Sequence, residues 1–150
     1  MDADKAIKRR VIDASKDDVW NVLADGWLYP LWVVGAARMR DVDDSWPEKG
    51  SRLHHSVGLW PLLINDVTQV LDVVPGESIS LRARAWPLGE AQVDMRLKAV
   101  GAKTEVEMEE FPTAGPGRLV PPPAQGLSLR LRNYQALRRF AAIAEQRTPA

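Results

Sequence analysis

Three consecutive stretches in the second half of the chain alternate apolar and polar residues with a period of two. Successive side chains of a β-strand point to opposite faces, so each stretch predicts a strand with one face against a core. Short turns at residues 86–89 and at Gly101 separate them, which indicates an antiparallel meander. The residues predicted to face the core are Ile79, Leu81, Ala83, Ala85, Ala91, Val93, Met95, Leu97, Thr104, Val106 and Met108.

Four more stretches bring the predicted sheet to about seven strands. They cover residues 7–14, 36–43, 52–57 and 62–74. Pro75 and Gly76 then form a strong turn signal. Both faces of residues 62–74 are partly apolar, so the pattern leaves open which of their side chains face the core.

Two short helices are predicted between the first two strands. Ser15 can cap the first helix, and Asp18 three residues later completes an acidic form of the capping box. The helix is expected to end at Asp25, with Gly26 as a left-handed cap. Residues 26–35 are apolar, aromatic and interrupted by Pro30, and they predict a second short helix or turn.

A long amphipathic helix is predicted over residues 127–146. Its apolar face needs a cover, and the apolar face of the meander can supply it. Before it, residues 111–125 hold several Pro and Gly and predict a long loop. The sequence thus predicts an α+β fold in one domain, residues 1–150, with a curved antiparallel sheet wrapped around the C-terminal helix. The predicted inward stripe of that helix is Leu127, Leu131, Tyr134, Leu137, Phe140, Ala141 and Ala144.

The amino-acid composition excludes several classes of function. Twenty Lys and Arg balance twenty Asp and Glu, so no basic excess favours nucleic-acid binding. The chain has no Cys, which excludes disulfides and thiolate chemistry, and no residue spacing suggests a metal site. Residues 1–10 are charged and unlike a signal peptide, and no run reaches the roughly 18 apolar residues of a membrane span. We therefore expect a cytoplasmic protein, a monomer or homodimer without cofactor or stable membrane insertion.

The order of elements is similar to the helix-grip fold of the START-like superfamily, which includes birch-pollen-type allergens. Within it, the chain resembles the bacterial polyketide cyclase/dehydrase and lipid-transport family (SRPBCC). The resemblance rests on residues 11–20 (VIDASKDDVW), 50–53 (GSRL) and 70–75 (VLDVVP), and on the C-terminal helix. It implies an internal cavity for a hydrophobic ligand, but these motifs specify no reaction, because the family holds cyclases, lipid carriers and quinone-binding proteins.

Topology predicts where aromatic residues gather. Alternate turns of a meander lie at the same end of the sheet, so the turns at 58–61 and 86–89 and the Pro-rich loop share one end. The segment that contains Pro30 is expected there too, and the turn at Trp46 at the opposite end. Such a rim is the mouth of an apolar pocket or, alternatively, a set of Trp side chains that plug a small core. The predicted rim consists of Trp27, Tyr29, Trp32, Trp60 and Trp86.

Three polar side chains are candidates inside the fold. His55 is in phase with Leu53, so it is predicted to point inward, either as a hydrogen-bonded core residue or as a ligand-binding or acid–base group. Glu110 continues the inward phase of its strand unless the strand ends or bulges at Glu109. Tyr134 lies on the predicted inward stripe of the helix, and Asn133 flanks it.

The candidates leave three functional hypotheses. The first is a binding module for a small hydrophobic or aromatic ligand that is lipid-, quinone- or polyketide-like. The second is a polyketide cyclase or dehydratase in which His55 works with Glu110 or Tyr134. The third is an interaction protein whose cavity is filled by Trp side chains. No GxSxG elbow, phosphate-binding glycine loop or HExxH motif occurs.

Overall fold

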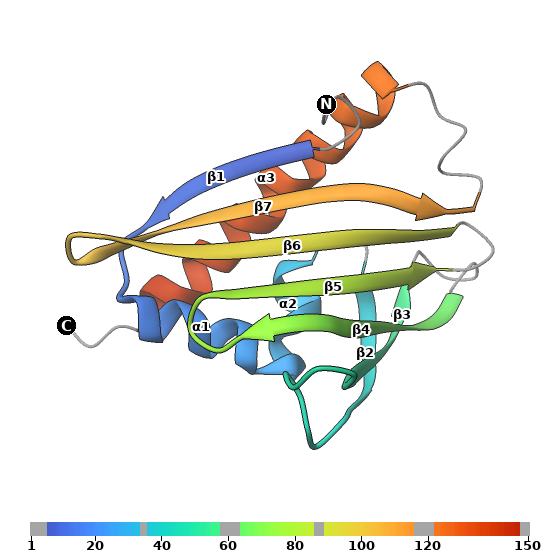
Figure 1. Cartoon of the computed structure of the whole chain (residues 1–150), viewed down its shortest axis with the longest axis horizontal. Helices are drawn as coiled ribbons and strands as arrows, with labels where there is room; N and C mark the ends of the chain where they lie inside the picture. The colour runs from blue at the N-terminus through green and yellow to red at the C-terminus, as the bar shows by residue number, and fades with distance from the viewer. Residues whose placement is uncertain (1–5, 34–35, 58–63, 86–88, 116–121, 148–150) are drawn as a thin grey trace.

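The strands and helices of the computed structural model follow the predicted order (Figure 1). The structure describes residues 6–33, 36–57, 64–85, 89–115 and 122–147. The described elements are β1 (Ala6–Ile12), α1 (Lys16–Ala24), the 3₁₀-helix η1 (Gly26–Leu28), α2 (Tyr29–Trp32), β2 (Ala36–Val42), β3 (Arg52–Val57), β4 (Ile64–Val74), β5 (Ser78–Ala85), β6 (Gly89–Val100), β7 (Lys103–Ala114) and α3 (Pro122–Arg147).

The strands form one seven-stranded sheet in the order β1-β7-β6-β5-β4-β3-β2, and every neighbouring pair is antiparallel. Strands β2 to β7 are a meander, as predicted. The N-terminal β1 joins the sheet beside β7, where Lys8 pairs with Met108. The helices lie on one side of this sheet, and α3 crosses behind β1 and β7 (Figure 1).

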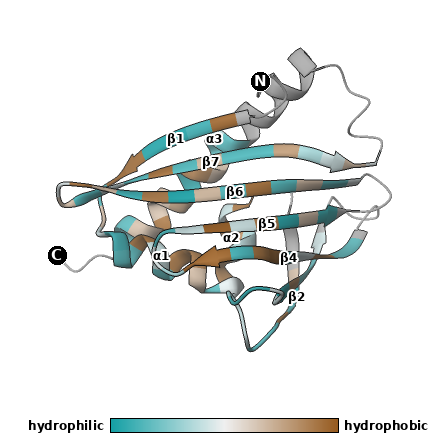
Figure 2. Ribbon diagram, in the orientation of Figure 1, coloured by the Kyte–Doolittle hydropathy of each residue, from teal (hydrophilic) through white to brown (hydrophobic). Residues whose placement is uncertain are grey.

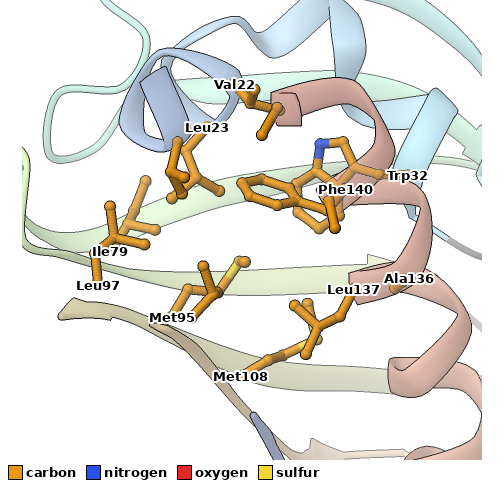
Figure 3. Packing of buried hydrophobic residues seen from close by; sticks show 14 of the residues in the cluster. Val22, Leu23, Trp32, Ile79, Met95, Leu97, Met108, Ala136, Leu137 and Phe140 are labelled. Atoms are coloured by element: carbon orange, nitrogen blue, oxygen red, sulfur yellow. The ribbon is translucent and has the colours of Figure 1, made fainter. Parts of the chain in front are cut away.

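The core lies between the sheet and α3. Met95 and Met108 project from the sheet toward Leu137 and Phe140 of the helix (Figure 3), and all four are at most 3% exposed. Along the strands, apolar and polar residues alternate, which Figure 2 shows as alternating brown and teal bands. Burial confirms the predicted faces: in β7, Thr104, Val106 and Met108 are buried, as expected for a strand with one face on the core.

The outer face of the sheet carries ion pairs. Glu107 accepts from Arg9 at 2.8 Å and from Arg96 at 2.7 Å, which links β1, β7 and β6. Both arginines are about half exposed. Such exposed pairs contribute little free energy of unfolding each, so the sheet is stabilised mainly from its apolar side.

Helix α1 begins and ends where predicted, but the predicted left-handed cap at its end is wrong. The Ser15 hydroxyl accepts from the Asp18 backbone N–H at 3.1 Å, so the cap is confirmed. Gly26 is not a left-handed cap: the helix ends at Asp25 in an extended conformation, and Gly26 has no positive φ. A Cβ on Gly26 would lie 2.5 Å from Cδ2 of Leu53 and 2.9 Å from Cγ1 of Val42, so a larger residue there would force these side chains to shift.

The predicted Pro-rich loop was too long at both ends. Strand β7 continues to Ala114, which pairs with Glu90. Helix α3 begins at Pro122, because proline is well suited to the first turn of a helix, where its missing N–H is not needed. The predicted end or bulge at Glu109 does not occur, since Glu109 pairs with Asp94 and Glu110 with Val93 without a register shift.

Candidate functional site

His55 lies on the inner face of β3 and is 2% exposed. Its Nε2 is 2.7 Å from Oγ1 of Thr68 on β4, a residue that is fully buried. The Tyr29 hydroxyl lies 3.2 Å from the same Oγ1. One threonine hydroxyl therefore joins a histidine from the sheet to a tyrosine from α2, and this hydrogen-bonded chain holds the imidazole in place.

A row of rings connects His55 with the C-terminal helix. The His55 ring stacks on Tyr29 with centroids 5.8 Å apart. Tyr29 meets Trp32 edge to face at 5.4 Å, and Trp32 meets Phe140 of α3 in the same way at 5.2 Å. Figure 3 shows the last of these contacts. The predicted rim residues Tyr29 and Trp32 are thus packed in the interior, only 7% and 3% exposed.

Four buried side-chain nitrogens have no hydrogen-bond partner among the residues that the structure describes. They are Nδ1 of His55, Nδ2 of Asn133, and Nε of Arg82 and of Arg84. His55 and Asn133 are both 2% exposed. Leaving a buried polar group unsatisfied costs about 1–3 kcal/mol, so each of these atoms is a candidate hydrogen-bonding group for a bound molecule.

Asn133, not Tyr134, occupies the inward stripe of α3. Tyr134 is 45% exposed, and its ring lies against Nζ of Lys8 at 5.2 Å, so the predicted inward orientation is wrong. The stripe follows Asn133, Ala136, Leu137, Phe140, Ala141 and Ala144, all at most 4% exposed. At 100° per residue around the helix axis, Asn133 lies within about 20° of Phe140, whereas Tyr134 lies about 120° from it. The angular position relative to Phe140 could therefore have identified Asn133 as the inward residue from the sequence.

Trp27 is not where the topology argument placed it. Its side chain is 57% exposed and lines a surface hollow of about 400 Å³ together with Trp46. Trp27 therefore lies at the end of the sheet that holds the turn at Trp46, opposite the predicted rim. The later residues of the segment, Tyr29 and Trp32, are buried instead. Trp60 and Trp86 lie outside the described residues.

Glu110 is buried on the inner face of β7. It is 6% exposed and pairs with Ala6 of β1 and Val93 of β6. The predicted inward phase of Glu110 is therefore confirmed. Its neighbour Glu109 lies on the other face, with a carboxylate oxygen 3.9 Å from Arg96 Nη1.

The ionisation of His55 follows from its surroundings. Burial lowers the pKa of His55 to about 4, because an imidazolium loses its hydration there. The charge of Asp66 opposes this shift, and those of Arg40 and His54 add to it. His55 is therefore neutral near pH 7, and it offers a hydrogen bond without a charge.

This shift predicts a loss of stability in mild acid. Below pH 6.5 the unfolded chain protonates His55 while the folded protein does not, so the free energy of unfolding falls between pH 6.5 and about 4. The integrated loss is about 3 kcal/mol at most, because one proton contributes about 1.4 kcal/mol per pH unit. Urea unfolding of His55→Gln across this range will lack that loss, whereas His54→Gln will retain it. Equal pH dependence of both variants would contradict a buried neutral His55.

The described part of the chain contains no group of three metal-ligating side chains. Among its described helices, none is both long and apolar enough to cross a membrane.

Several solved structures share the whole architecture. An aromatase/cyclase from Streptomyces sp. R1128 superposes with a TM-score of 0.73 at 17% identity, over 97% of this chain and 96% of its own. Protein TTHA0849 from Thermus thermophilus gives 0.73 at 12% identity, over 97% and 99%. Ara h 8.0201 gives 0.72 at 6% identity, over 95% and 97%. No protein-family model and no curated protein sequence matches the chain.

These identities are too low to transfer a function, but the coverage and TM-scores show a common fold. The open seven-stranded antiparallel sheet, the two short helices after the first strand and the long C-terminal helix are all present here. The chain therefore has the same helix-grip fold as these structures, as the sequence resemblance predicted.

Proposed function

We propose that the protein binds a small, mostly apolar molecule between the inner face of the sheet and α3. The observation that carries this proposal is the His55 ring, which is 2% exposed, held at Nε2 by Thr68, and without a partner at Nδ1 among the described residues. Most buried polar side-chain atoms have a hydrogen-bond partner, so the unpaired Nδ1 supports a role in binding. The imidazole stacks on Tyr29, which is in contact with Trp32, so a ligand beside these rings gains hydrophobic burial and one oriented hydrogen bond.

The low pKa of His55 favours a role in ligand binding over a role as a catalytic base. A general base works best when its pKa is near the working pH, and burial lowers the pKa of His55 to about 4. A neutral imidazole is a good hydrogen-bonding group but a weak proton acceptor. The hydrogen-bonding role therefore explains the geometry with fewer assumptions.

An enzyme of the cyclase or dehydratase type is the second candidate. It is supported by the buried carboxyl of Glu110 on the same face of the sheet and by the fold shared with an aromatase/cyclase. Tyr134 has no place in this mechanism, because its side chain is exposed over β1. If His55→Leu bound a polyketide-like substrate normally but no longer converted it, this second function would replace the first.

Binding can be tested with a pair of adjacent histidines. Native mass spectrometry of protein purified from its own host is expected to show a small apolar molecule at one per chain. In calorimetric titrations with 2-naphthol, we expect His55→Leu to weaken binding about tenfold, as for loss of one well-placed buried hydrogen bond. His54→Leu is the matched control, because the side chain of His54 pairs with Asp43 instead.

The control variant should bind 2-naphthol within about twofold of the original protein. A protein that carries no molecule from its host and binds neither 2-naphthol nor naphthalene would overturn the proposed function. Equal weakening in both histidine variants would remove His55 from the site.

A further inference from the structure

We infer that the surface hollow beside Trp27 binds a small organic cation with an alkylated ammonium group, such as a quaternary ammonium compound. The hollow has a volume of about 400 Å³ and lies where α1 and η1 meet the loop after β2. None of its lining residues belongs to the row of rings from His55 to Phe140. It is therefore a second site, separate from the interior discussed above.

The first step is the exposure of Trp27, which is one wall of the hollow. Its backbone N–H donates to Oδ1 of Asp25, the N-cap of η1, at 3.2 Å. The residue is nevertheless 57% exposed, whereas Tyr29 and Trp32 of the same segment are at most 7% exposed. A mostly exposed indole loses the hydrophobic free energy that burial would give. An indole on a fixed backbone at the wall of a hollow is suited to contact a ligand.

The second step is that Trp46 brings another indole to the same hollow. Its Nε1 donates to the backbone carbonyl oxygen of Leu23 at 3.1 Å, which attaches the loop after β2 to the end of α1. Gly26 lies beside this ring, since its would-be Cβ would be 3.3 Å from Cδ1 of Trp46. The face of an indole attracts cations more strongly than that of any other aromatic side chain.

The third step is the charge of the hollow. Asp25, Asp43 and Asp44 line it, and none of its described lining residues is basic. Asp43 is partly neutralised by Arg52 and His54, whose nitrogens are 3.8 and 2.9 Å from its oxygens. The hydrogen bond with His54 also lowers the pKa of Asp43, so this carboxyl is ionised at neutral pH. Asp44 is exposed to solvent. The lining therefore favours a cation over a neutral molecule or an anion.

The fourth step is that these side chains suit an organic cation better than a metal ion. The described residues contain no group of three side chains that could hold a metal. An alkylated ammonium group needs no converging ligands, because ring faces and nearby carboxylates attract it. A primary ammonium is strongly hydrated and gains less from exposed rings. The volume of the hollow also falls within the range of about 300–1,000 Å³ that is typical of small-molecule sites.

The test compares choline with 3,3-dimethyl-1-butanol, a neutral molecule of the same shape. In NMR titrations of the isotope-labelled full chain, choline is expected to shift the indole N–H signal of Trp27 with a Kd of about 1 mM or lower. The neutral analogue is expected to bind about fivefold more weakly, because it lacks the charge. The signal of Trp27 is identified by its loss in Trp27→Ala.

Two variants, each with a matched control, assign the site. Trp27→Ala should weaken choline binding about fivefold, followed at the indole of Trp46, and Asp44→Asn about threefold. Leu31→Ala controls for the first, because it removes an apolar side chain that is 59% exposed in the neighbouring helix. Asp41→Asn controls for the second, because it removes the same charge from an exposed residue outside the hollow. Both controls should leave the Kd unchanged.

Equal binding of choline and its neutral analogue would overturn the inference. Choline binding that survives in Trp27→Ala would also do so, as would shifts of the same size with sodium chloride at equal concentration. Because the hollow is separate from the interior, Trp27→Ala should bind 2-naphthol as the original protein does. Failure of choline to bind therefore leaves the proposed function standing, and failure of 2-naphthol to bind leaves this inference standing.

Discussion

Replacing Phe140 by alanine will lower the free energy of unfolding by about 3–5 kcal/mol, as is typical for a fully buried aromatic residue. Phe140 is 0% exposed and projects from α3 toward the sheet. It packs edge to face against Trp32, and the two ring centroids are 5.2 Å apart. The loss combines the transfer free energy of the ring with the cavity that its rigid neighbours cannot close. Urea unfolding followed by circular dichroism measures it.

Two controls distinguish packing from helix propensity. Phe140→Leu keeps most of the volume and should cost less than about 2 kcal/mol. Tyr134→Ala removes an exposed ring from the same helix, and its cost should stay below about 1 kcal/mol, the scale of its contact with Lys8. If Tyr134→Ala cost as much as Phe140→Ala, α3 would not be attached to the sheet through the stripe described above.

Gly89→Ala will lower the free energy of unfolding by about 3 kcal/mol or more. Gly89 has a φ of 134°, a conformation that strains any residue with a side chain. A Cβ would also overlap the backbone carbonyl oxygen of Ala114, where the start of β6 meets the end of β7. Backbone cannot move aside as a flexible side chain can, so the strand ends must separate. Thermal and urea unfolding report the loss.

Gly101→Ala separates the two causes of that loss. Gly101 also has a positive φ, 62°, but nothing in the described structure lies within 4 Å of its would-be Cβ. It should therefore cost only about 1–2 kcal/mol, the penalty of the left-handed conformation alone. Equal costs at both positions would show that the overlap with Ala114 relaxes freely.

The sheet could be predicted well because its information is local. A strand with one buried face must alternate, and β5 occurs at the predicted residues Ser78–Ala85. The inward orientation of His55 followed from the same alternation, and burial confirms it. The fold class followed from the order of these elements along the chain, and the solved helix-grip structures confirm it.

The errors all concern residues whose environment depends on distant parts of the chain. Gly26 has the sequence context of a helix cap, but in the fold its position is crowded by the side chains of Leu53 and Val42 from two strands. The place of Trp27 depends on how η1 packs in the fold, which the local pattern does not contain. Hydrophobicity alone puts Tyr134 on the inward stripe of α3, whereas the helical angle points to Asn133. The periodicity of apolar residues predicts which side of a helix or strand is buried, but only the tertiary structure shows which residues pack against it.

The pairing of β1 with β7 has a consequence for how the protein folds. The ion pair between Arg9 and Glu107 joins residues 98 positions apart, and the backbone N–H of Asp13 donates to Glu145, 132 positions away. A nascent chain therefore exposes the edge of its first strand until β7 has been made. Because bringing such distant segments together costs much chain entropy before any contact rewards it, closure of the sheet is expected to be slow and late.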